Sequence, residues 1–347
     1  MRIRSVVAGL PSRIVTNADI LAMIAEYSSA GFDGDLDDTL RKIDTYLRYA
    51  GSDERRWLDD GERPIDLLRT ATKTALDQAE VRADAVDLLI YTGVGRGFIE
   101  PGGAYHSAAA LGLDGAHCFD IVDACMSWTR AVQVTQALMR TGQYRTAVIV
   151  NAEFSLRMGG LVFPHLFTLS NQRALESIFP AYTLGEGASA TVLSNDENGP
   201  WEFRFASRPD LAPLCNVTLP GFEGFCDPSE KLAANGVGYF SSFGGEMHEV
   251  GAADALDVFR SLNVDPNKVS TLVTHASSKR HWQLMAERVG LGDVIHHVYH
   301  KTGNLVSASV PTAMASAIES GALRRGDRAV GWVGSAGMSF GAFSFVF

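Results

Sequence analysis

The chain has 347 residues, of which 46% are hydrophobic and 20% charged, so it is long enough to bury a large core in one unit or in two closely packed halves. Its formal net charge of -10 gives no basic footprint, which argues against nucleic acid as a partner and favours small molecules or proteins. The N-terminus turns polar too early for a signal peptide, and no apolar run approaches the ~18 residues of a membrane span. We therefore expect a soluble cytoplasmic protein with no membrane partner.

Short apolar, β-branched runs alternate with helical stretches along the chain. Strands are predicted at residues 4–10, 85–93, 145–153, 189–196, 269–277, 328–336 and 342–347. This alternation is typical of an α/β fold.

The two halves of the chain repeat one order of elements. Residues 75–93 and 258–276 both read as a helix end, a turn and an apolar strand, and residues 125–153 and 307–337 both read as a small-residue helix, a turn and a strand. The offset is 183 residues from 75 to 258 and also from 145 to 328, where the strand of each second segment starts, which indicates an internal duplication. The turn-rich sequence NDENGP marks the boundary, so we predict one half at 1–197 and another at 198–347.

Two segments fit the duplicated scheme poorly. Residues 154–184 and 205–248 are rich in Pro, Gly and aromatic residues, as in FPHLF and GYFSSFGGEMH. Long ordered loops of this kind often shape access to a site. We interpret both segments as insertions that cover a site rather than as core strands.

Cys125 lies where a strand-like run gives way to a helix of small and apolar residues, in DIVDACMSWTRAVQ. A thiol at a helix start lies near the positive end of the helix dipole, which favours the thiolate and hence nucleophilic attack. A buried structural cysteine is the alternative. Cys118 lies within a strand run and is assigned to the core. The four cysteines show neither a zinc-binding spacing nor a disulfide framework, which fits a reducing cytoplasm.

His275 follows an apolar strand, and Asn304 precedes the second small-residue helix. In a duplicated fold, equivalent strand ends and helix starts approach the pseudo-twofold axis, so Cys125, His275 and Asn304 can meet there. A thiol could then take up an acyl group, while imidazole and amide donate hydrogen bonds to a thioester carbonyl that becomes an enolate. A satisfied strand-end histidine and a turn asparagine are the alternatives.

The glycine-rich C-terminal sequence GWVGSAGMSFGAFSFVF permits close approach of backbone to a ligand. The amides of Ala336 and Gly337 could complete an oxyanion hole with the amide of Cys125, tight strand packing being the alternative. His296, His297 and His300 place histidines four residues apart but lack the glutamate that makes the HExxH motif specific. We therefore predict no metal site.

These features together resemble the β-ketoacyl-acyl carrier protein synthase III group of the thiolase superfamily. The likeness spans nearly the whole chain, from VVAGLPSRIVTNADI through AGSDERRW, DACMS and LGEGASATVL to GNLVSASVP and GSAGMSFGAFSFVF. The resemblance implies a homodimer with a five-layered αβαβα fold, in which the N-terminal half carries the nucleophilic cysteine and the C-terminal half carries the histidine and asparagine.

The same resemblance implies a Cys125-His275-Asn304 triad and a ping-pong reaction. An acyl group moves to Cys125 before decarboxylative Claisen condensation with a malonyl-type thioester. The implied partners are acyl-CoA and acyl carrier protein, whose thioesters are substrates, and no cofactor is implied. The sequence departs from the group after His275, where ASSKRH stands in place of Gln-Ala-Asn, and it lacks the usual Trp that stacks on the CoA adenine.

Residues 91–113 are similar to acyl-CoA head-to-head condensing enzymes that make long-chain β-ketoacids. There a glutamate in a Glu-Pro context, matching Glu100, reaches across the dimer interface as a base; a surface carboxylate is the alternative.

Another rival is transfer of the acyl group from Cys125 to an alcohol or amine. Asn304 favours enolate chemistry, because plain transfer needs a base more than a second amide donor. A non-catalytic subunit that binds acyl carrier protein is the remaining hypothesis.

Overall fold

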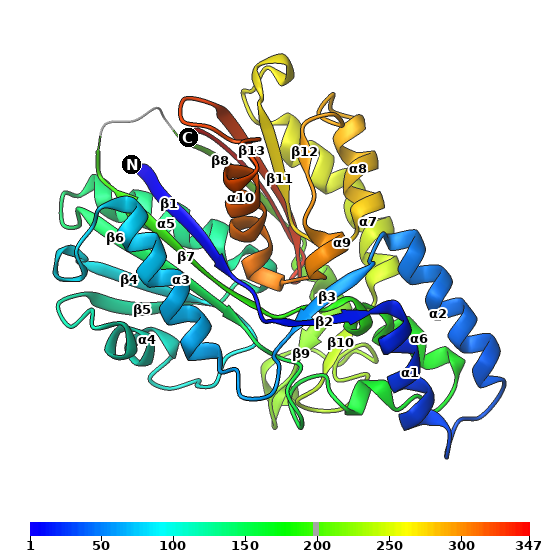
Figure 1. Cartoon of the computed structure of the whole chain (residues 1–347). Helices are drawn as coiled ribbons and strands as arrows, with labels where there is room; N and C mark the ends of the chain where they lie inside the picture. The colour runs from blue at the N-terminus through cyan, green and yellow to red at the C-terminus, as the bar shows by residue number, and fades with distance from the viewer. Residues whose placement is uncertain (197–200) are drawn as a thin grey trace.

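The computed structural model describes residues 1–196 and 201–347 and contains two five-stranded sheets (Figure 1). The first sheet has the order β1 (Arg2–Gly9), β7 (Gly187–Ser194), β6 (Thr146–Glu153), β4 (Leu88–Thr92), β5 (His117–Ile121). The second has the order β8 (Glu202–Ser207), β14 (Ser339–Val346), β13 (Arg328–Ser335), β11 (Thr271–Thr274), β12 (Ile295–His296). In each sheet the last three strands are parallel and the first two run antiparallel to their neighbours.

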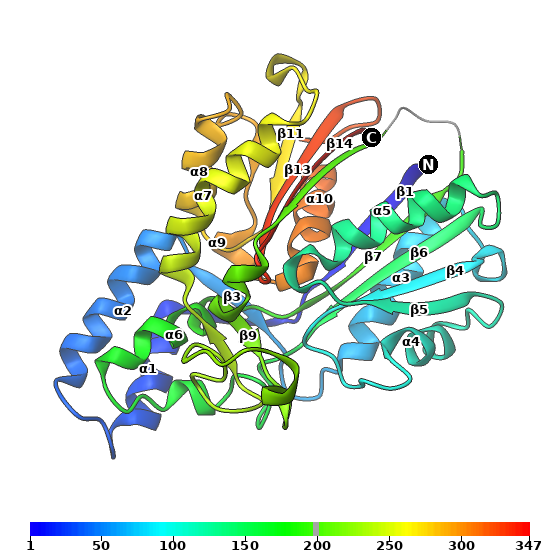
Figure 2. The same cartoon turned by 180° about the vertical axis from the view of Figure 1, so that it is seen from behind.

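Helices form three layers around these sheets (Figures 1 and 2). Helices α5 (Ser127–Arg140) and α10 (Ser309–Glu319) pack between the sheets, where Trp128 and Met314 share one core. Helices α3 (Pro64–Ala79) and α4 (Gly103–Leu111) pack on the first sheet, while α7 (Gly244–Arg260) and α8 (Lys279–Glu287) pack on the second. Because both faces of each sheet are covered, strands such as β4 are buried throughout. The predicted five-layered αβαβα fold is confirmed.

The duplication extends to single residues beside Cys125. The turns Ala124–Met126 and Val306–Ala308 each precede an inter-sheet helix, and Ala124 and Val306 have left-handed φ values of 45° and 49°. Strands β6 and β13 are offset by 182 residues, one fewer than predicted. On that offset Ser307 is the structural equivalent of Cys125. The predicted boundary between 197 and 198 lies outside the described residues, so the division at that point stays a prediction.

One predicted insertion is partly wrong. The segment 205–248 begins inside β8, which pairs with β14, and ends inside α7. Phe203 and Phe205 pack against the central core while Arg204 between them is exposed, so β8 is a half-buried edge strand with alternating polarity. The intervening residues include the short strands β9 (Cys215–Val217) and β10 (Phe240–Ser242), which pair with each other.

A separate module packs beside the two sheets. It contains β2 (Arg13–Thr16), α1 (Asn17–Ser28), α2 (Leu36–Ala50), β3 (Glu54–Trp57) and α6 (Leu175–Ile178), which share an apolar cluster. Helix α1 starts at a capping box in which the Asp19 carboxylate accepts from the Thr16 backbone N–H and the Thr16 hydroxyl accepts from the Asp19 N–H. The short helix α9 (Tyr299–Thr302) packs on β3 and links this module to the second sheet.

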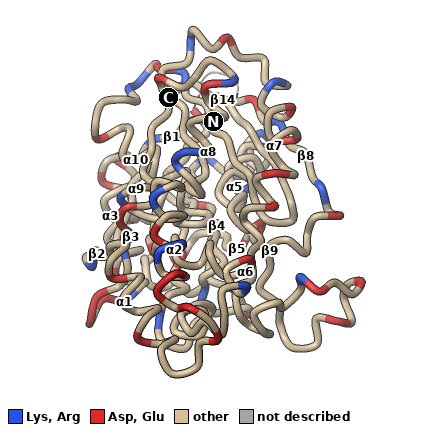
Figure 3. Tube along the Cα trace, turned by 90° about the vertical axis from the view of Figure 1, so that its right-hand side faces the viewer, with Lys and Arg blue, Asp and Glu red and all other residues tan. Residues whose placement is uncertain are grey.

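Charged residues of both signs are interspersed along the trace (Figure 3). Within residues 1–196 and 201–347, no helix combines the length and the apolar character needed to traverse a bilayer.

Candidate active site

A cavity of about 1150 Å³ lies where the two sheets meet the α1–α2 module. Its lining includes Cys125 from the first half, His275, Asn304 and Ala336 from the second, and Tyr49 from α2. The structure therefore places the three predicted catalytic side chains at one cavity, although they come from positions 125, 275 and 304 in the chain. Residues of both predicted insertions, among them Leu161 and Phe240, also line it.

Cys125 is positioned by a turn that is fixed from both halves. The Met126 amide donates to Ser335 Oγ at 3.2 Å, and Ser335 Oγ donates to the Asp123 carbonyl at 3.3 Å. Within the turn, Ser127 Oγ accepts from the Asp123 amide at 2.8 Å and donates to the Ala124 carbonyl at 2.7 Å. A left-handed alanine is uncommon and indicates a backbone that its surroundings over-determine, as at other functional sites.

The electrostatic setting of the thiol differs from the sequence-based expectation. Burial raises the pKa of Cys125, nearby Cys215 and Glu153 raise it further, and hydrogen bonds from the amides of Ala336 and Cys125 itself lower it. Burial therefore opposes the thiolate that the helix start favours, and the net direction of the pKa is upward. Cys125 is a neutral thiol near pH 7, and it must lose its proton when it attacks an acyl group.

This setting predicts a pH dependence for alkylation of Cys125. A raised pKa means that thiolate appears only at high pH, so the iodoacetamide reaction at Cys125 should accelerate by about tenfold per pH unit from pH 7 to 9 with no plateau. Peptide mass spectrometry after timed quenching measures this rate, and exposed Cys226 reports reagent activity in the same sample. A plateau below pH 8 would show that the thiol ionises readily.

His275 directly follows β11 and is 5% exposed. Its Nε2 lies 3.2 Å from Asn304 Oδ1, and because that oxygen only accepts, Nε2 is the donor. Burial lowers the pKa of His275 to about 4, against the opposing effect of hydrogen bonds to Asn304 and the Gly334 carbonyl, and His248 lowers it further. The imidazole is therefore neutral at pH 7.

Asn304 is held by its backbone and by its amide oxygen. Its N–H donates to the Thr183 carbonyl at 2.8 Å, and Oδ1 also accepts from the Val306 amide at 2.9 Å. Among the described residues no acceptor binds Nδ2. The amide group is thus oriented with its oxygen engaged and its two N–H donors left for another acceptor at the cavity.

The two C-terminal residues predicted for the oxyanion hole differ in placement. Ala336 lines the cavity, and its amide donates to the Cys125 thiol. Gly337 follows it in the turn between β13 and β14 with a φ of 117°, a conformation suited to glycine. Within the described part of the chain, Gly337 is absent from the cavity lining.

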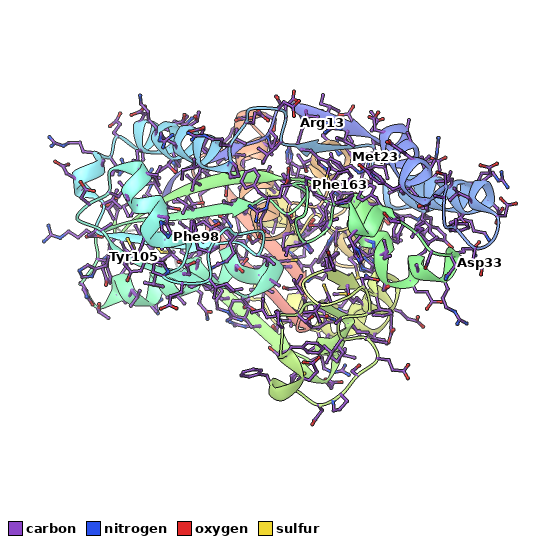
Figure 4. The ribbon with its side chains drawn as sticks, turned by 90° about the horizontal axis from the view of Figure 1, so that it is seen from below. Arg13, Met23, Asp33, Phe98, Tyr105 and Phe163 are labelled. Carbon is purple, nitrogen blue, oxygen red and sulfur yellow. The ribbon has the colours of Figure 1, made fainter. Side chains whose placement is uncertain are left out.

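Glu100 is not brought to Cys125 within one chain. It is exposed in the loop between β4 and α4 and does not line the cavity. That loop is fixed by an Arg96–Asp120 ion pair of 2.5 Å, and the Asp120 carboxylate also accepts from the Gly103 and Ala104 amides. Phe98 and Tyr105 project from this end of the molecule, opposite Met23 of α1 (Figure 4).

Glu153 is a cavity residue that the sequence interpretation missed. It is 2% exposed at the end of β6, and its carboxylate accepts from the amides of Val94, Gly95 and Ser307 and from Ser307 Oγ. Burial raises its pKa. Glu153 ties the two halves together beside Cys125, and the signal for it was an acidic residue ending an otherwise apolar strand.

The three clustered histidines do not converge. His296 Nε2 lies 2.9 Å from Ser316 Oγ, and His297 Nε2 lies 3.1 Å from Gln283 Oε1. Across residues 1–196 and 201–347, no group of three or more His, Cys, Asp or Glu side chains is arranged to hold a metal ion.

Comparisons with known proteins agree with this geometry. Residues 259–347 match the family model described as 3-oxoacyl-[acyl-carrier-protein] synthase III, C terminal. A β-ketoacyl-[acyl-carrier-protein] synthase III of Clostridium beijerinckii is 27% identical over 349 residues, covering 99% of this chain and 98% of the relative. The Clostridium perfringens enzyme of the same name is 26% identical over 322 residues, covering 88% of this chain and 92% of the relative.

Solved structures show the same fold. A Cys-to-Ala variant of Xanthomonas campestris OleA superimposes with a TM-score of 0.82 at 19% identity, covering 99% of this chain and 96% of that one. The 3-oxoacyl-[acyl-carrier-protein] synthase III of Aquifex aeolicus superimposes with a TM-score of 0.79 at 21% identity, covering 100% of this chain and 99% of that one. The predicted resemblance to the synthase III group is confirmed, and the superpositions agree with the thiolase-like fold.

Proposed function

We propose that this synthase III-like enzyme condenses an acyl group held on Cys125 with a malonyl-type thioester to give a β-ketoacyl product. The observation that carries the proposal is the shared cavity, in which a thiol faces the same space as a hydrogen-bonded His275–Asn304 pair. A nucleophile beside two neutral hydrogen-bond donors is the arrangement that acyl uptake followed by enolate formation requires.

In the first half-reaction, the Cys125 sulfur attacks the thioester carbonyl of acyl-CoA. The thiol proton passes to neutral His275, and the amides of Cys125 and Ala336, with Gly337 adjacent, stabilise the oxyanion. The carbon–sulfur bond to CoA then breaks, and the CoA sulfur takes the proton from His275 and leaves as a thiol, which restores the neutral imidazole. The acyl group remains on Cys125.

In the second half-reaction, Nδ2 of Asn304 donates to the carbonyl oxygen of the malonyl thioester, and the Nε2–H of His275 is shared between that oxygen and Asn304 Oδ1. Loss of CO2 leaves an enolate whose charge these donors stabilise, and its carbon attacks the acyl carbonyl on Cys125. The carbon–sulfur bond breaks, and Cys125 takes up a proton to become a thiol again. Decarboxylation supplies the carbanion, so this half-reaction needs no base to remove an α-proton.

The test combines intact-mass spectrometry with product analysis. Incubation with acyl-CoAs of increasing chain length should add one acyl group, and subsequent malonyl-CoA or malonyl-acyl carrier protein should remove it with release of CO2 and a β-keto product. Absence of any adduct contradicts a nucleophilic Cys125. Ester or amide products alone, with added alcohol or amine, would contradict condensation. The same series ranks chain length and compares the two carriers.

The proposed assembly is a cytoplasmic homodimer. Strand β5 is an unpaired sheet edge in the chain, and large apolar residues near it are exposed: Phe98 (49%), Ile99 (75%), Tyr105 (55%) and Val122 (61%). An unpaired edge flanked by exposed apolar residues favours association with another copy. Light scattering coupled to size exclusion measures the mass.

Head-to-head condensation of two acyl-CoAs is the second candidate, and the exposed position of Glu100 beside this edge favours it. If Glu100 acts across the dimer as the base, Glu100→Ala should lower β-ketoacid formation from acyl-CoA alone by about 10²-fold or more and leave Cys125 acylation in place. Glu26→Ala, an exposed carboxylate on α1, is the control. Unchanged product formation by the Glu100 variant, measured by chromatography with mass detection, would assign Glu100 to the surface only.

A further inference from the structure

A second pair of imidazoles lines the cavity beside His275. His248 lies on α7 and His281 on α8, with ring centroids 4.1 Å apart and an interplanar angle of 44°. Both are half-buried and line the same cavity as Cys125. His248 is also near enough to His275 to lower the pKa of that imidazole. The half-reactions described above use neither ring.

The hydrogen bonding of this pair differs from that of four other histidines. His117, His165, His296 and His297 each have a ring nitrogen within 2.9–3.1 Å of a protein partner. Over the described ranges 1–196 and 201–347, no such partner is present for the rings of His248 and His281. A neutral imidazole offers one donor and one acceptor, and in this half-buried pair both are available to a molecule in the cavity. The cavity thus presents polar nitrogens to whatever enters it.

Both imidazoles are neutral bases at pH 7. Burial lowers the pKa of His248, and burial followed by repulsion from His248 and Arg288 lowers that of His281 to about 4. The nearby acidic residue on α7, Glu246, is paired with Lys231. The adjacent cation on α8, Arg280, lies over the Tyr49 ring at 4.7 Å.

We propose that His248, which packs against His281, accepts the proton of a hydroxyl or amine acceptor that takes the acyl group from Cys125, which gives the enzyme an ester- or amide-forming activity. This rests on the proposed acylation of Cys125. Decarboxylative condensation requires no proton acceptor for its second substrate, whereas an alcohol or amine must lose a proton to acylate. His275 donates to Asn304 Oδ1, whereas His248 lines the same cavity and its ring has no protein hydrogen-bond partner among the described residues.

The step balances without an added oxidant or reductant. The acceptor oxygen or nitrogen bonds to the thioester carbonyl carbon while its proton passes to a ring nitrogen of His248. The tetrahedral intermediate collapses, the carbon–sulfur bond breaks, and the Cys125 sulfur leaves with the bonding electrons. The sulfur then takes the proton from His248, which restores the thiol and the neutral imidazole.

Single-turnover discharge of the isolated acyl-enzyme tests the proposal. Acyl-Cys125 enzyme is mixed with a panel of primary alcohols and amines or, in parallel, with malonyl-CoA, and loss of the adduct and product identity are followed by mass spectrometry. The wild type should give ester or amide with at least one acceptor. His248→Phe should slow this discharge by about 10²-fold or more. The fold-decrease in the discharge rate should exceed any fold-decrease in the rate of Cys125 acylation by a factor of at least about 30.

Two further variants keep the result interpretable. Glutamine at position 248 retains hydrogen bonding but is a poor base. If His248→Phe folds poorly, His248→Gln should still slow discharge to alcohols and amines far more than it slows Cys125 acylation. His165→Phe, outside the cavity lining, keeps a ring against Tyr239 and should discharge like the wild type. The proposal is overturned if His248→Gln discharges to alcohols and amines at the wild-type rate. It is also overturned if the acylated wild type reacts with malonyl-CoA alone, whereas absence of acylation would refute the function proposed above as well.

Discussion

Replacing Cys125 with alanine should abolish the acyl adduct and lower β-keto product formation by on the order of 10⁴-fold or more. The Cys125 thiol forms the covalent thioester, and no neighbouring amide or imidazole can form a thioester in its place. Intact-mass spectrometry after incubation with acyl-CoA measures the adduct, and steady-state kinetics with malonyl-CoA measures the rate.

Cys215 provides a matched control. It lines the same cavity, and burial raises its pKa to about 11, so it tests whether any cavity thiol becomes acylated. Cys215→Ala should retain the adduct. A persistent adduct on Cys125→Ala, or one that peptide mapping places on Cys215, would contradict the nucleophile assignment. Thermal unfolding of both variants separates loss of chemistry from loss of fold.

The layered fold could be predicted because its signals are local. Strands such as β6 and β7 are buried on both faces, so their sequences are continuous apolar runs. The repeated helix–turn–strand order indicates the duplication. Strand β8 escaped prediction because WEFRFAS alternates polar and aromatic residues over a few positions and follows a turn-rich stretch. Its strand character depends on pairing with β14, which is distant in sequence.

The candidate site was predictable only where the duplication pointed to it. Equivalent strand ends and helix starts meet at the pseudo-twofold axis, so Cys125, His275 and Asn304 could be grouped from the sequence alone. His248 and Glu153 could not, because helix packing and strand order bring them to the cavity and no spacing in the sequence marks them. Burial is equally invisible in a sequence, so the upward effect of burial on the pKa of the Cys125 thiol could not be predicted from its helix start.

Replacing Asn304 should separate the two half-reactions. In Asn304→Ala, acylation of Cys125 should remain within a few-fold of the wild type, while β-keto formation should fall by about 10²–10³-fold, because one of two donors to the enolate oxygen is lost. Rapid quenching with intact-mass detection gives the acylation rate, and product release from malonyl-CoA gives the condensation rate. Asn267→Ala, an exposed asparagine outside the cavity lining, is the control.

Asn304→Asp tests whether Asn304 acts through its Nδ2 hydrogen-bond donor or only by holding neighbouring groups in place. A carboxylate retains an oxygen that can accept from the Val306 amide and from His275 Nε2, as Oδ1 does now, but it has no N–H to offer. If the Nδ2 donor stabilises the enolate, the aspartate variant must lose condensation as the alanine variant does. Wild-type condensation by Asn304→Asp would limit Asn304 to holding His275 and the turn before α10. Equal loss of acylation and condensation in both variants would show that the side chain supports the whole cavity, because the first half-reaction makes no use of an enolate donor.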